Sequence, residues 1–349
     1  MIKIGNKILG KKYPCLVIAE ISANHDGDFN RMKRLIKSAK KAGADLIKIQ
    51  SYTADSLTLN SKKKDFIINN SSPWKKNQYF WNLYKKAETP IGWHGKIFNY
   101  AKKEGIGIFS SPFDVSAVDM LEKLKCPAYK IASAEINHIP LIERIAKTKK
   151  PIIFSIGLAN LEEIKTAIKI IKKYKNNKII ILQCVSSYPA PLNEQNIKAI
   201  PLIEKKFKVL AGLSDHTTNS ISSLAAVALG ASVIEKHFNL SDKRKTVDSF
   251  FSTNEKKFKI LVEEIRSVEK VLGYSKIQIS KSSMKNIHSK RSIYISSKIK
   301  KGEKINKENI KVVRPSFGLN PKFYNYVLGK KVNKNLFYGD RLSLSHIKK

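Results

Sequence analysis

Cysteine, acidic residues and long apolar runs are all scarce in this 349-residue chain. The three cysteines, Cys15, Cys126 and Cys184, are an odd number without metal-type spacing, which excludes a scaffold built on disulfide bonds. We expect them to be reduced thiols in a cytoplasmic protein. No apolar run approaches the roughly 20 residues that cross a bilayer, and no early segment has the pattern of a signal peptide.

Acidic residues are outnumbered by basic ones, 28 to 66, which gives a formal net charge of +38. Such an excess suits binding to nucleic acid or to a membrane surface. The excess is mostly lysine and is spread along the whole chain, whereas a binding stripe is local and richer in arginine, which forms bidentate contacts. We therefore expect compositional drift, with no specific nucleic-acid partner and no membrane, although the charge can speed the capture of anionic substrates.

A glycine-rich G-x-G-x-x-G turn is missing after the first predicted strand, which removes the usual mark of a doubly wound sheet. Helical patterns, such as residues 161–174, alternate with short apolar runs. Eight strands alternating with helices over roughly 250 residues predict a (β/α)8 barrel, or TIM barrel. The predicted strands are 15–23, 44–52, 105–113, 128–135, 151–158, 179–189, 209–217 and 231–238.

Each predicted strand begins apolar and ends polar. Active sites of TIM barrels form at the carboxyl ends of the strands, so the eight polar ends predict a ring of ionisable side chains. The candidates for this ring are Glu20, Asn24, His25, Lys48, Gln50, Ser110, Ser111, Lys130, Ser133, Glu135, Ser155, Ser186, Tyr188, Ser214, Asp215, His216, Glu235, Lys236 and His237.

Two regions depart from the barrel pattern. Residues 53–92 are too long for an ordinary loop and are rich in aromatic residues, so they form either a lid or sugar-stacking surface or a helix packed on the barrel exterior. After the barrel, which we expect at residues 1–273, a polar Ser/Lys-rich linker covers 274–290. Residues 291–349 then show short strand-like pieces separated by turns, which predicts a small β-rich domain.

Two lysines, Lys48 and Lys130, lie inside otherwise apolar strands. A lysine in a barrel strand either points outward along the surface or points inward and needs an anion. Lys48 shares its strand face with Gln50, so we favour the inward direction for both lysines. Two ammonium groups among serine hydroxyls suit a small ligand that carries phosphate and carboxylate groups.

The carboxylates and histidines leave alternatives open. His216 and His237 end adjacent strands and either chelate one divalent metal or are two hydrogen-bonded polar side chains. Glu20, Glu135 and Glu235 are candidate catalytic residues, each of which can act as a general base or neutralise a lysine.

Several motifs resemble the sialic acid synthase family in order and spacing over nearly the whole chain. They include IAEISANHDGD (18–28), SSPFD (110–114), AYKIAS (128–133), GLSDHT (212–217) and ALGASVIEKHF (228–238). The C-terminal segment resembles the family's antifreeze-like, or SAF, domain. Within the family, QSYTADSLTL (50–59) and DSFFS (248–252) are most similar to the pseudaminic acid synthases. KRKTVDS (243–249) departs from the glycine and proline that are usual there.

The resemblance implies an enzyme that condenses phosphoenolpyruvate and water with 2,4-diacetamido-2,4,6-trideoxy-altrose to give pseudaminic acid and phosphate. It implies that Glu20 assists the attacking water and that His216 and His237 hold Mn²⁺ or Mg²⁺. The phosphoenolpyruvate site implied is Lys48, Ser111, Lys130, Ser133, Ser155, Ser186 and Ser214. The residues implied to orient the amino-sugar aldehyde are Gln50, Tyr188, Asp248 and Arg314.

The family also implies a domain-swapped homodimer, in which the SAF domain reaches over the partner's barrel. Two alternatives to this function stay open. The first is the same chemistry on another sugar, which would make the enzyme an N-acetylneuraminate or legionaminic acid synthase. The second is a non-catalytic basic protein that binds nucleic acid.

Overall fold

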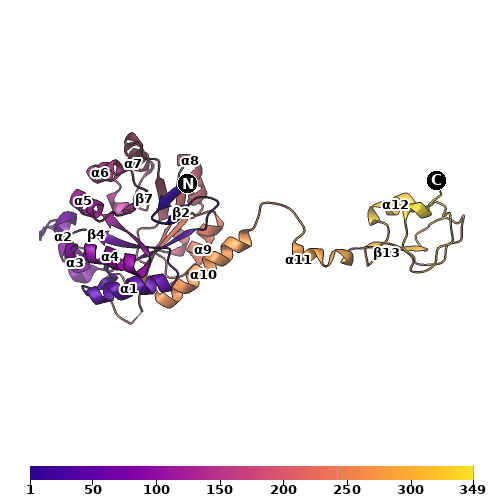
Figure 1. Ribbon diagram of the computed structural model, residues 1–349, viewed down its shortest axis with the longest axis horizontal. Helices are drawn as coiled ribbons and strands as arrows, with labels where there is room; N and C mark the ends of the chain where they lie inside the picture. Colours follow the sequence, from indigo (N-terminus) through magenta and orange to yellow (C-terminus); the bar gives the residue numbers. More distant parts are fainter. Residues whose placement is uncertain (242, 349) are drawn as a thin grey trace. The chain divides into compact units, whose positions relative to one another are not determined.

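The computed structural model describes residues 1–241 and 243–348, and it divides into two compact units, Met1–Gly273 and Tyr274–Lys349 (Figure 1). Each unit has its own apolar core. Among the described residues, no helix combines the length and the hydrophobicity that crossing a membrane requires.

Eight parallel strands of the first unit form a closed barrel, because β10 pairs with β3 on one side and with β9 on the other. These strands begin with apolar residues and are buried at nearly every position, on both faces, as is usual for parallel sheets covered by helices. The predicted TIM barrel is confirmed. The barrel strands are β3 (Leu16–Glu20), β4 (Leu46–Ser51), β5 (Gly107–Pro112), β6 (Tyr129–Ile131), β7 (Ile152–Ser155), β8 (Ile179–Cys184), β9 (Leu210–Asp215) and β10 (Val233–Asn239).

A helix follows each barrel strand along the chain (Figure 1). In α7 the buried residues recur at helical spacing, and the Asn160 side chain caps the first turn by accepting from two backbone N–H groups. The helices of the first unit are α1 (Phe29–Lys41), α2 (Ala54–Leu57), α3 (Phe80–Ala87), α4 (His94–Glu104), α5 (Val115–Lys123), α6 (Ile139–Lys147), α7 (Leu161–Lys173), α8 (Ala199–Phe207), α9 (Ile221–Ala228) and α10 (Glu255–Leu272).

Seven of the eight barrel strands end earlier than the sequence predicts, β10 being the exception, and polar residues follow them in turns. β3 is followed by a 3-10 turn over Ser22–His25, and β6 by another over Ser133–Glu135. Residues in such turns no longer alternate between the two faces of a strand. Their directions therefore do not follow from the strand pattern.

An ion-pair network lies at the end of the barrel where the strands begin, around Asp45, the residue before β4. The Oδ1 atom of Asp45 accepts a hydrogen bond from Lys7 Nζ at 2.7 Å. Its Oδ2 atom accepts from the Val17 N–H at 2.9 Å and from Arg266 Nη2 at 2.7 Å. Arg266 Nη1 donates to the Cys15 carbonyl at 2.8 Å. This network ties α10 and the hairpin of β1 (Ile2–Ile4) and β2 (Lys7–Leu9) to the barrel.

The second unit holds the strands β12 (Ser292–Ile295) and β13 (Ile310–Val313) and the short helices α11 (Lys281–Met284) and α12 (Tyr324–Val327). The Ser316 N–H donates to the His288 carbonyl at 3.1 Å, so the last part of the predicted linker contacts this unit. In the first unit, the short strand β11 (Thr253–Asn254) pairs with the end of the barrel strand β10. The core of the second unit is formed by Ile293, Ile295, Ile299, Ile305, Ile310, Val327, Val332, Leu336 and Leu342.

Candidate active site

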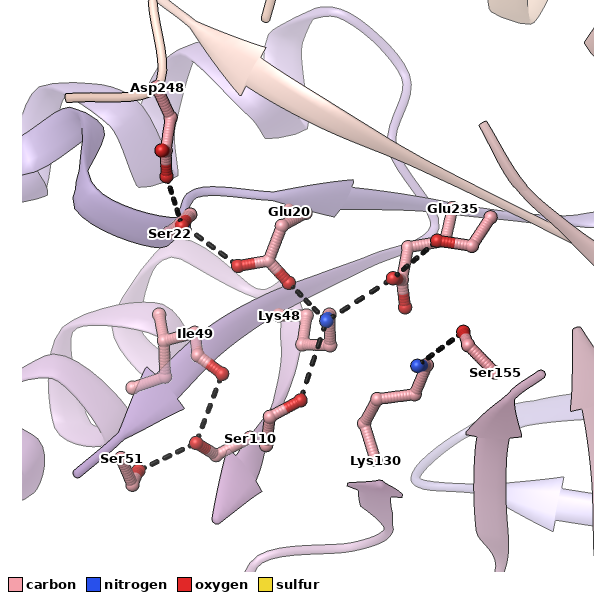
Figure 2. A network of polar contacts seen from close by, with 12 residues as sticks. Glu20, Ser22, Lys48, Ile49, Ser51, Ser110, Lys130, Ser155, Glu235 and Asp248 are labelled. Carbon is pink, nitrogen blue, oxygen red and sulfur yellow. Dashed lines mark hydrogen bonds and ion pairs between the residues drawn. The ribbon is translucent and has the colours of Figure 1, made fainter. Parts of the chain in front are cut away.

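Lys48 lies between two carboxylates inside the mouth of the barrel (Figure 2). Its Nζ is 2.5 Å from Glu20 Oε2 on β3 and 3.2 Å from Glu235 Oε1 on β10. It also donates to Ser111 Oγ on β5 at 3.4 Å. Glu20 is fully buried, and the other two charged residues are at most 4% exposed. Neighbouring strands therefore bring the four side chains together inside the barrel.

The two carboxylates differ in acidity although both contact Lys48. Burial raises the pKa of Glu20 to about 7, with Lys48 opposing the shift and Glu235 adding to it. Burial also acts to raise the pKa of Glu235, but Lys48 and Lys130 outweigh it and hold that pKa below its usual value. A carboxyl group with a pKa near 7 can take up and release a proton at neutral pH, as a general acid or base must.

Lys130 on β6 is a second buried cation, only 2% exposed. Its Nζ donates to Ser155 Oγ at 2.6 Å (Figure 2). It also donates to the Ile131 carbonyl at 3.1 Å. Within residues 1–241 and 243–348, no carboxylate oxygen lies within ion-pair distance of this ammonium group. Burial lowers the pKa of Lys130 to about 8. A buried ammonium group without a counter-ion is costly, so the site favours an anionic ligand.

His216 and His237 lie side by side in an edge arrangement, with ring centroids 5.6 Å apart. His216 Nδ1 is 2.8 Å from the Val185 carbonyl oxygen, so Nδ1 carries the proton and Nε2 offers a lone pair. In the described structure, His237 Nδ1 is buried without a hydrogen-bond partner. Burial lowers the pKa of both rings, and that of His237 falls well below its usual value. Both imidazoles are therefore neutral near pH 7.

These two imidazoles fit a divalent cation that takes its other ligands from water and substrate. The described residues hold no group of three His, Cys, Asp or Glu side chains placed to bind a metal ion. The protein alone would therefore supply an open site with two nitrogen ligands rather than a closed cage. Ser214 lies beside this pair, with its Oγ 3.4 Å from His216 Nε2 and 3.2 Å from Glu235 Oε1.

A cavity of about 350 Å³ opens beside His237. Gln50, Tyr188 and Asp248 line it together with aromatic and aliphatic side chains. Asp248 is buried, accepts a short hydrogen bond from Ser22 Oγ, and has a pKa raised by burial (Figure 2). The size and the mixed lining are typical of sites for small molecules. The apolar lining consists of Tyr52, Trp74, Phe80, Leu83, Tyr84, Ala87, Val247 and Phe251.

The aromatic segment 53–92 supplies much of this lining. Trp74 lies with its ring centroid 5.4 Å from that of Tyr188 and 6.3 Å from that of Phe251, and its Nε1–H donates to the Val247 carbonyl at 2.9 Å. Trp81 instead donates to Asp55 and is not part of the cavity wall. The segment thus contributes Trp74 and Tyr84 to the cavity wall, and its role as a lid or stacking surface stays a prediction.

For four predicted site residues, the contacts found among the described residues do not include Lys48, Lys130, His216 or His237. Ser133 Oγ accepts from the Leu158 N–H at 2.7 Å. Ser186 Oγ lies close to Gly157, because a Cβ atom added to that glycine would be only 2.6 Å from it. Glu135 is on the rim, 3.6 Å from His138. Arg314 is an exposed residue of the second unit, which is described by itself.

Three members of the predicted polar ring face the outside of the barrel, so the ring is smaller than expected. Ser110 Oγ donates to the Ile49 carbonyl at 3.0 Å and contacts Ser51, on the side of α4 (Figure 2). Lys236 pairs with Asp215 at 2.8 Å, and Asp215 accepts from Ser223 on α9. In strands, neighbouring side chains point to opposite faces, so a polar pair such as Ser110 and Ser111 sends only one member inward.

The sequence prediction missed Tyr52 and Phe251 as site residues, and it included Trp74 only as one of several aromatic residues of segment 53–92. Tyr52 follows Lys48 and Gln50 at steps of two, so strand alternation was a signal for it. Trp74 and Phe251 lie outside the barrel strands, and no periodic pattern directs them to the mouth.

The chain is similar to known proteins over nearly its whole length. Residues 35–277 match the model of the NeuB family, and residues 290–348 match that of the SAF domain. A pseudaminic acid synthase of Campylobacter jejuni subsp. jejuni serotype O:23/36 (strain 81-176) is 47% identical over 98% of this chain and 99% of its own length. A pseudaminic acid synthase of Helicobacter pylori (strain ATCC 700392 / 26695) is 42% identical over 96% of this chain and 98% of its own length.

A solved structure gives a similar result. The crystal structure of N-acetylneuraminic acid (sialic acid) synthetase from Leptospira borgpetersenii serovar Hardjo-bovis in complex with citrate superposes with a TM-score of 0.73 at 34% identity. The match covers 82% of this chain and 94% of that one.

Proposed function

The chain belongs to the NeuB family, and from that premise we propose that it is an enzyme that makes pseudaminic acid from phosphoenolpyruvate, water and 2,4-diacetamido-2,4,6-trideoxy-altrose. Phosphate is the second product. The family resemblance predicted from the motifs is confirmed. N-acetylneuraminate and legionaminic acid synthesis are the same chemistry on other sugars, and the identities of 47% and 42% to pseudaminic acid synthases favour the first sugar.

The observation that carries the proposal is the buried ammonium group of Lys130, which has no carboxylate in reach among the described residues. Phosphoenolpyruvate brings a phosphate and a carboxylate, and either would supply the missing negative charge. Lys48 lies on the same interior and already contacts Glu20 and Glu235. The further groups proposed for phosphoenolpyruvate are the hydroxyls of Ser111, Ser133, Ser155, Ser186 and Ser214.

Glu20 is proposed as the general base. Carbon 3 of phosphoenolpyruvate attacks the aldehyde carbon of the sugar, so the new C–C bond forms from the enol π bond while the carbonyl π bond opens. The former aldehyde oxygen takes up a proton and becomes a hydroxyl group. Water then adds at carbon 2 while Glu20 accepts its proton, and C–O cleavage releases phosphate. A pKa near 7 suits this role, because the group is largely ionised just above neutral pH and still basic. Glu235 stays ionised beside Lys48, and Glu135 on the rim is the weakest candidate of the three carboxylates.

His216 and His237 are proposed to hold Mn²⁺ or Mg²⁺, because both imidazoles are neutral and each has a ring nitrogen available. Such an ion supplies Lewis-acid polarisation of a carbonyl oxygen. Gln50, Tyr188 and Asp248, which line the cavity beside His237, are proposed to orient the sugar chain.

The test is phosphate release from phosphoenolpyruvate with a panel of amino sugars, with Mn²⁺, with Mg²⁺ and with a chelator. We expect release with the 2,4-diacetamido-trideoxy sugar, much less with N-acetylmannosamine, and none with the chelator. Activity on every sugar alike would contradict the proposed substrate. Salt-dependent nucleic-acid binding without phosphate release would favour the non-catalytic alternative.

We also propose the domain-swapped homodimer that the family implies, with Arg314 reaching the partner's sugar site. A guanidinium group is a rigid donor fork suited to an acetamido carbonyl and hydroxyls. Arg314→Ala and Glu20→Ala should each be inactive, and mixing them should restore part of the activity, since one barrel of a mixed dimer has both residues intact. Proven subunit exchange without recovery would refute the swap.

The reaction is proposed to take place in the cytoplasm. The three cysteines are buried and unpaired in the described structure, so the fold needs no oxidising compartment.

A further inference from the structure

Tyr52 combines burial with an unused polar group. It is 3% exposed and lines the cavity of about 350 Å³, yet its hydroxyl has no hydrogen-bond partner among the described residues. Its oxygen is not one of the fully buried, unsatisfied atoms of the described residues, so the hydroxyl opens into the cavity, where an acceptor on a ligand can become its partner. The hydroxyl is therefore available to a ligand in this cavity.

Tyr52 directly follows β4, which ends at Ser51, and so lies beyond the proposed phosphoenolpyruvate site. Lys48, Gln50 and Tyr52 follow one another at steps of two residues and share one face. Each step advances the face by about 6.6 Å. Lys48 lies deepest with Glu20 and Glu235, while Gln50 and Tyr52 both line the sugar cavity. A sugar whose aldehyde lies near Lys48 and His237 would therefore have its far end near Tyr52.

The ring of Tyr52 is held in place. It makes edge contacts with Tyr84 and Phe113, at centroid distances of 6.2 and 5.1 Å, and packs with Ala23 and Ala87. A ring fixed in this way presents its hydroxyl in one direction at little entropic cost. Burial raises the pKa of this phenol well above its ordinary value, so it is protonated and can donate at neutral pH.

We propose that Tyr52 is a specificity-determining residue, whose hydroxyl donates a hydrogen bond to the acetamido carbonyl on carbon 4 of the sugar. Leu83, Tyr84 and Ala87 form the adjoining apolar wall, which suits the acetyl methyl group and the methyl group at carbon 6. A sugar with hydroxyl groups at carbons 4 and 6 would leave polar groups against this wall. The inference rests on the proposed function and adds the residue that selects the sugar.

The test compares Tyr52→Phe with the unaltered enzyme on two sugars, the 2,4-diacetamido-2,4,6-trideoxy sugar and its analogue with a hydroxyl at carbon 4. For the first sugar, KM should rise about tenfold, because a buried hydrogen bond to the substrate is lost. For the analogue, KM should change less than about twofold, and so should KM for phosphoenolpyruvate and kcat. The thermal unfolding temperature should not fall, since the hydroxyl has no partner in the free protein.

Tyr129→Phe is the matched control. Tyr129 is fully buried on β6, but its hydroxyl donates to Glu122 on α5, on the outside of the barrel. This variant should lose stability and keep all its KM values. Equal changes for both sugars in Tyr52→Phe, or no change for either, would overturn the inference. An unaltered enzyme that releases no phosphate with either sugar would defeat the proposed function instead.

Discussion

The two ends of the barrel both carry buried or half-buried charged groups, but these groups differ in whether they have partners within the protein. At the amino end, both oxygens of Asp45 accept hydrogen bonds, and Arg266 contacts Asp45, Glu269 and the Cys15 carbonyl. At the mouth, Lys130 has no ion pair, while Glu235 Oε2 and His237 Nδ1 have no hydrogen-bond partner within the described residues. The chain satisfies its own polar groups at one end and leaves them open at the other.

This difference suggests that the amino end contributes mainly to stability and the mouth mainly to ligand binding and turnover. Each unsatisfied buried group costs about 1–3 kcal/mol in the free protein. A ligand that satisfies such groups returns this free energy as binding, which stabilises the complex. Changes at the mouth should therefore affect turnover or substrate binding more than folding, and changes at the amino end should do the reverse.

Glu20→Gln should have the largest effect on activity. We expect kcat to fall about a thousandfold, because an amide cannot accept the proton of the attacking water. The protein should remain folded, since Glu235 still pairs with Lys48. The checks are steady-state phosphate release and thermal unfolding.

Asp45→Ala is the counterpart at the amino end. It removes the acceptor for Arg266, Lys7 and the Val17 N–H. The free energy of unfolding should fall by about 2 kcal/mol, while kcat of the folded fraction should stay within about twofold. A loss of kcat in this variant, or near-normal kcat in Glu20→Gln, would contradict the assignment of catalysis to the mouth and of stability to the amino end.

Lys130→Met should affect activity less than Glu20→Gln does. Lys130→Met should raise KM for phosphoenolpyruvate about 10- to 100-fold, as the loss of a charge-assisted contact of about 1.5–3 kcal/mol implies. KM for the sugar should hardly change, and the protein should not unfold more easily, because an unpaired buried charge is removed. Initial rates at varied concentrations of each substrate measure both constants.

Arg266→Met should show the opposite pattern. Arg266 contacts Asp45, Glu269 and the Cys15 carbonyl, so its loss should lower the free energy of unfolding by about 2 kcal/mol without changing either KM. If Lys130→Met raised both KM values equally, Lys130 would be structural, like Arg266.

The fold and the centre of the site could be predicted from the sequence because both depend on repeated local patterns. Eight apolar runs separated by helical patterns are enough to indicate a barrel, and the fold and the family are confirmed. Lys48 and Gln50, on one face of a strand, lie in the site as alternation predicts. The roles of the individual site residues stay predictions.

The remainder depends on information that periodicity does not carry. Adjacent polar residues such as Ser110 and Ser111 leave the phase of a strand undecided, and the structure sends Ser110 outward. Glu135 follows the early end of β6, where a 3-10 turn replaces the strand. Trp74 reaches the cavity through a loop whose course depends on tertiary packing with Tyr188 and Phe251.

The smallest expected effect, and the most direct test of the difference between the ends, is the pH dependence that Glu20 confers. Its pKa in the free enzyme is raised to about 7, so kcat/KM should fall about tenfold per pH unit below pH 7 and level off above it. The residual activity of Glu20→Gln should lack this limb, whereas Asp45→Ala should keep it.

The stability of the protein should depend on pH in the direction that the raised pKa of Glu20 requires. The folded state binds the Glu20 proton more tightly than the unfolded state does, so this contribution to stability is complete below the unfolded pKa of about 4.5 and is lost as pH rises through about 7. The quantity to compare is the unfolding temperature of Glu20→Gln minus that of the unaltered enzyme. This difference should be larger at pH 8 than at pH 4.5. Other groups titrate in the same range in both proteins, so only the difference between the two curves reports on Glu20. A difference that is constant with pH, together with an unchanged kcat/KM limb in Glu20→Gln, would show that another group at the mouth titrates near pH 7.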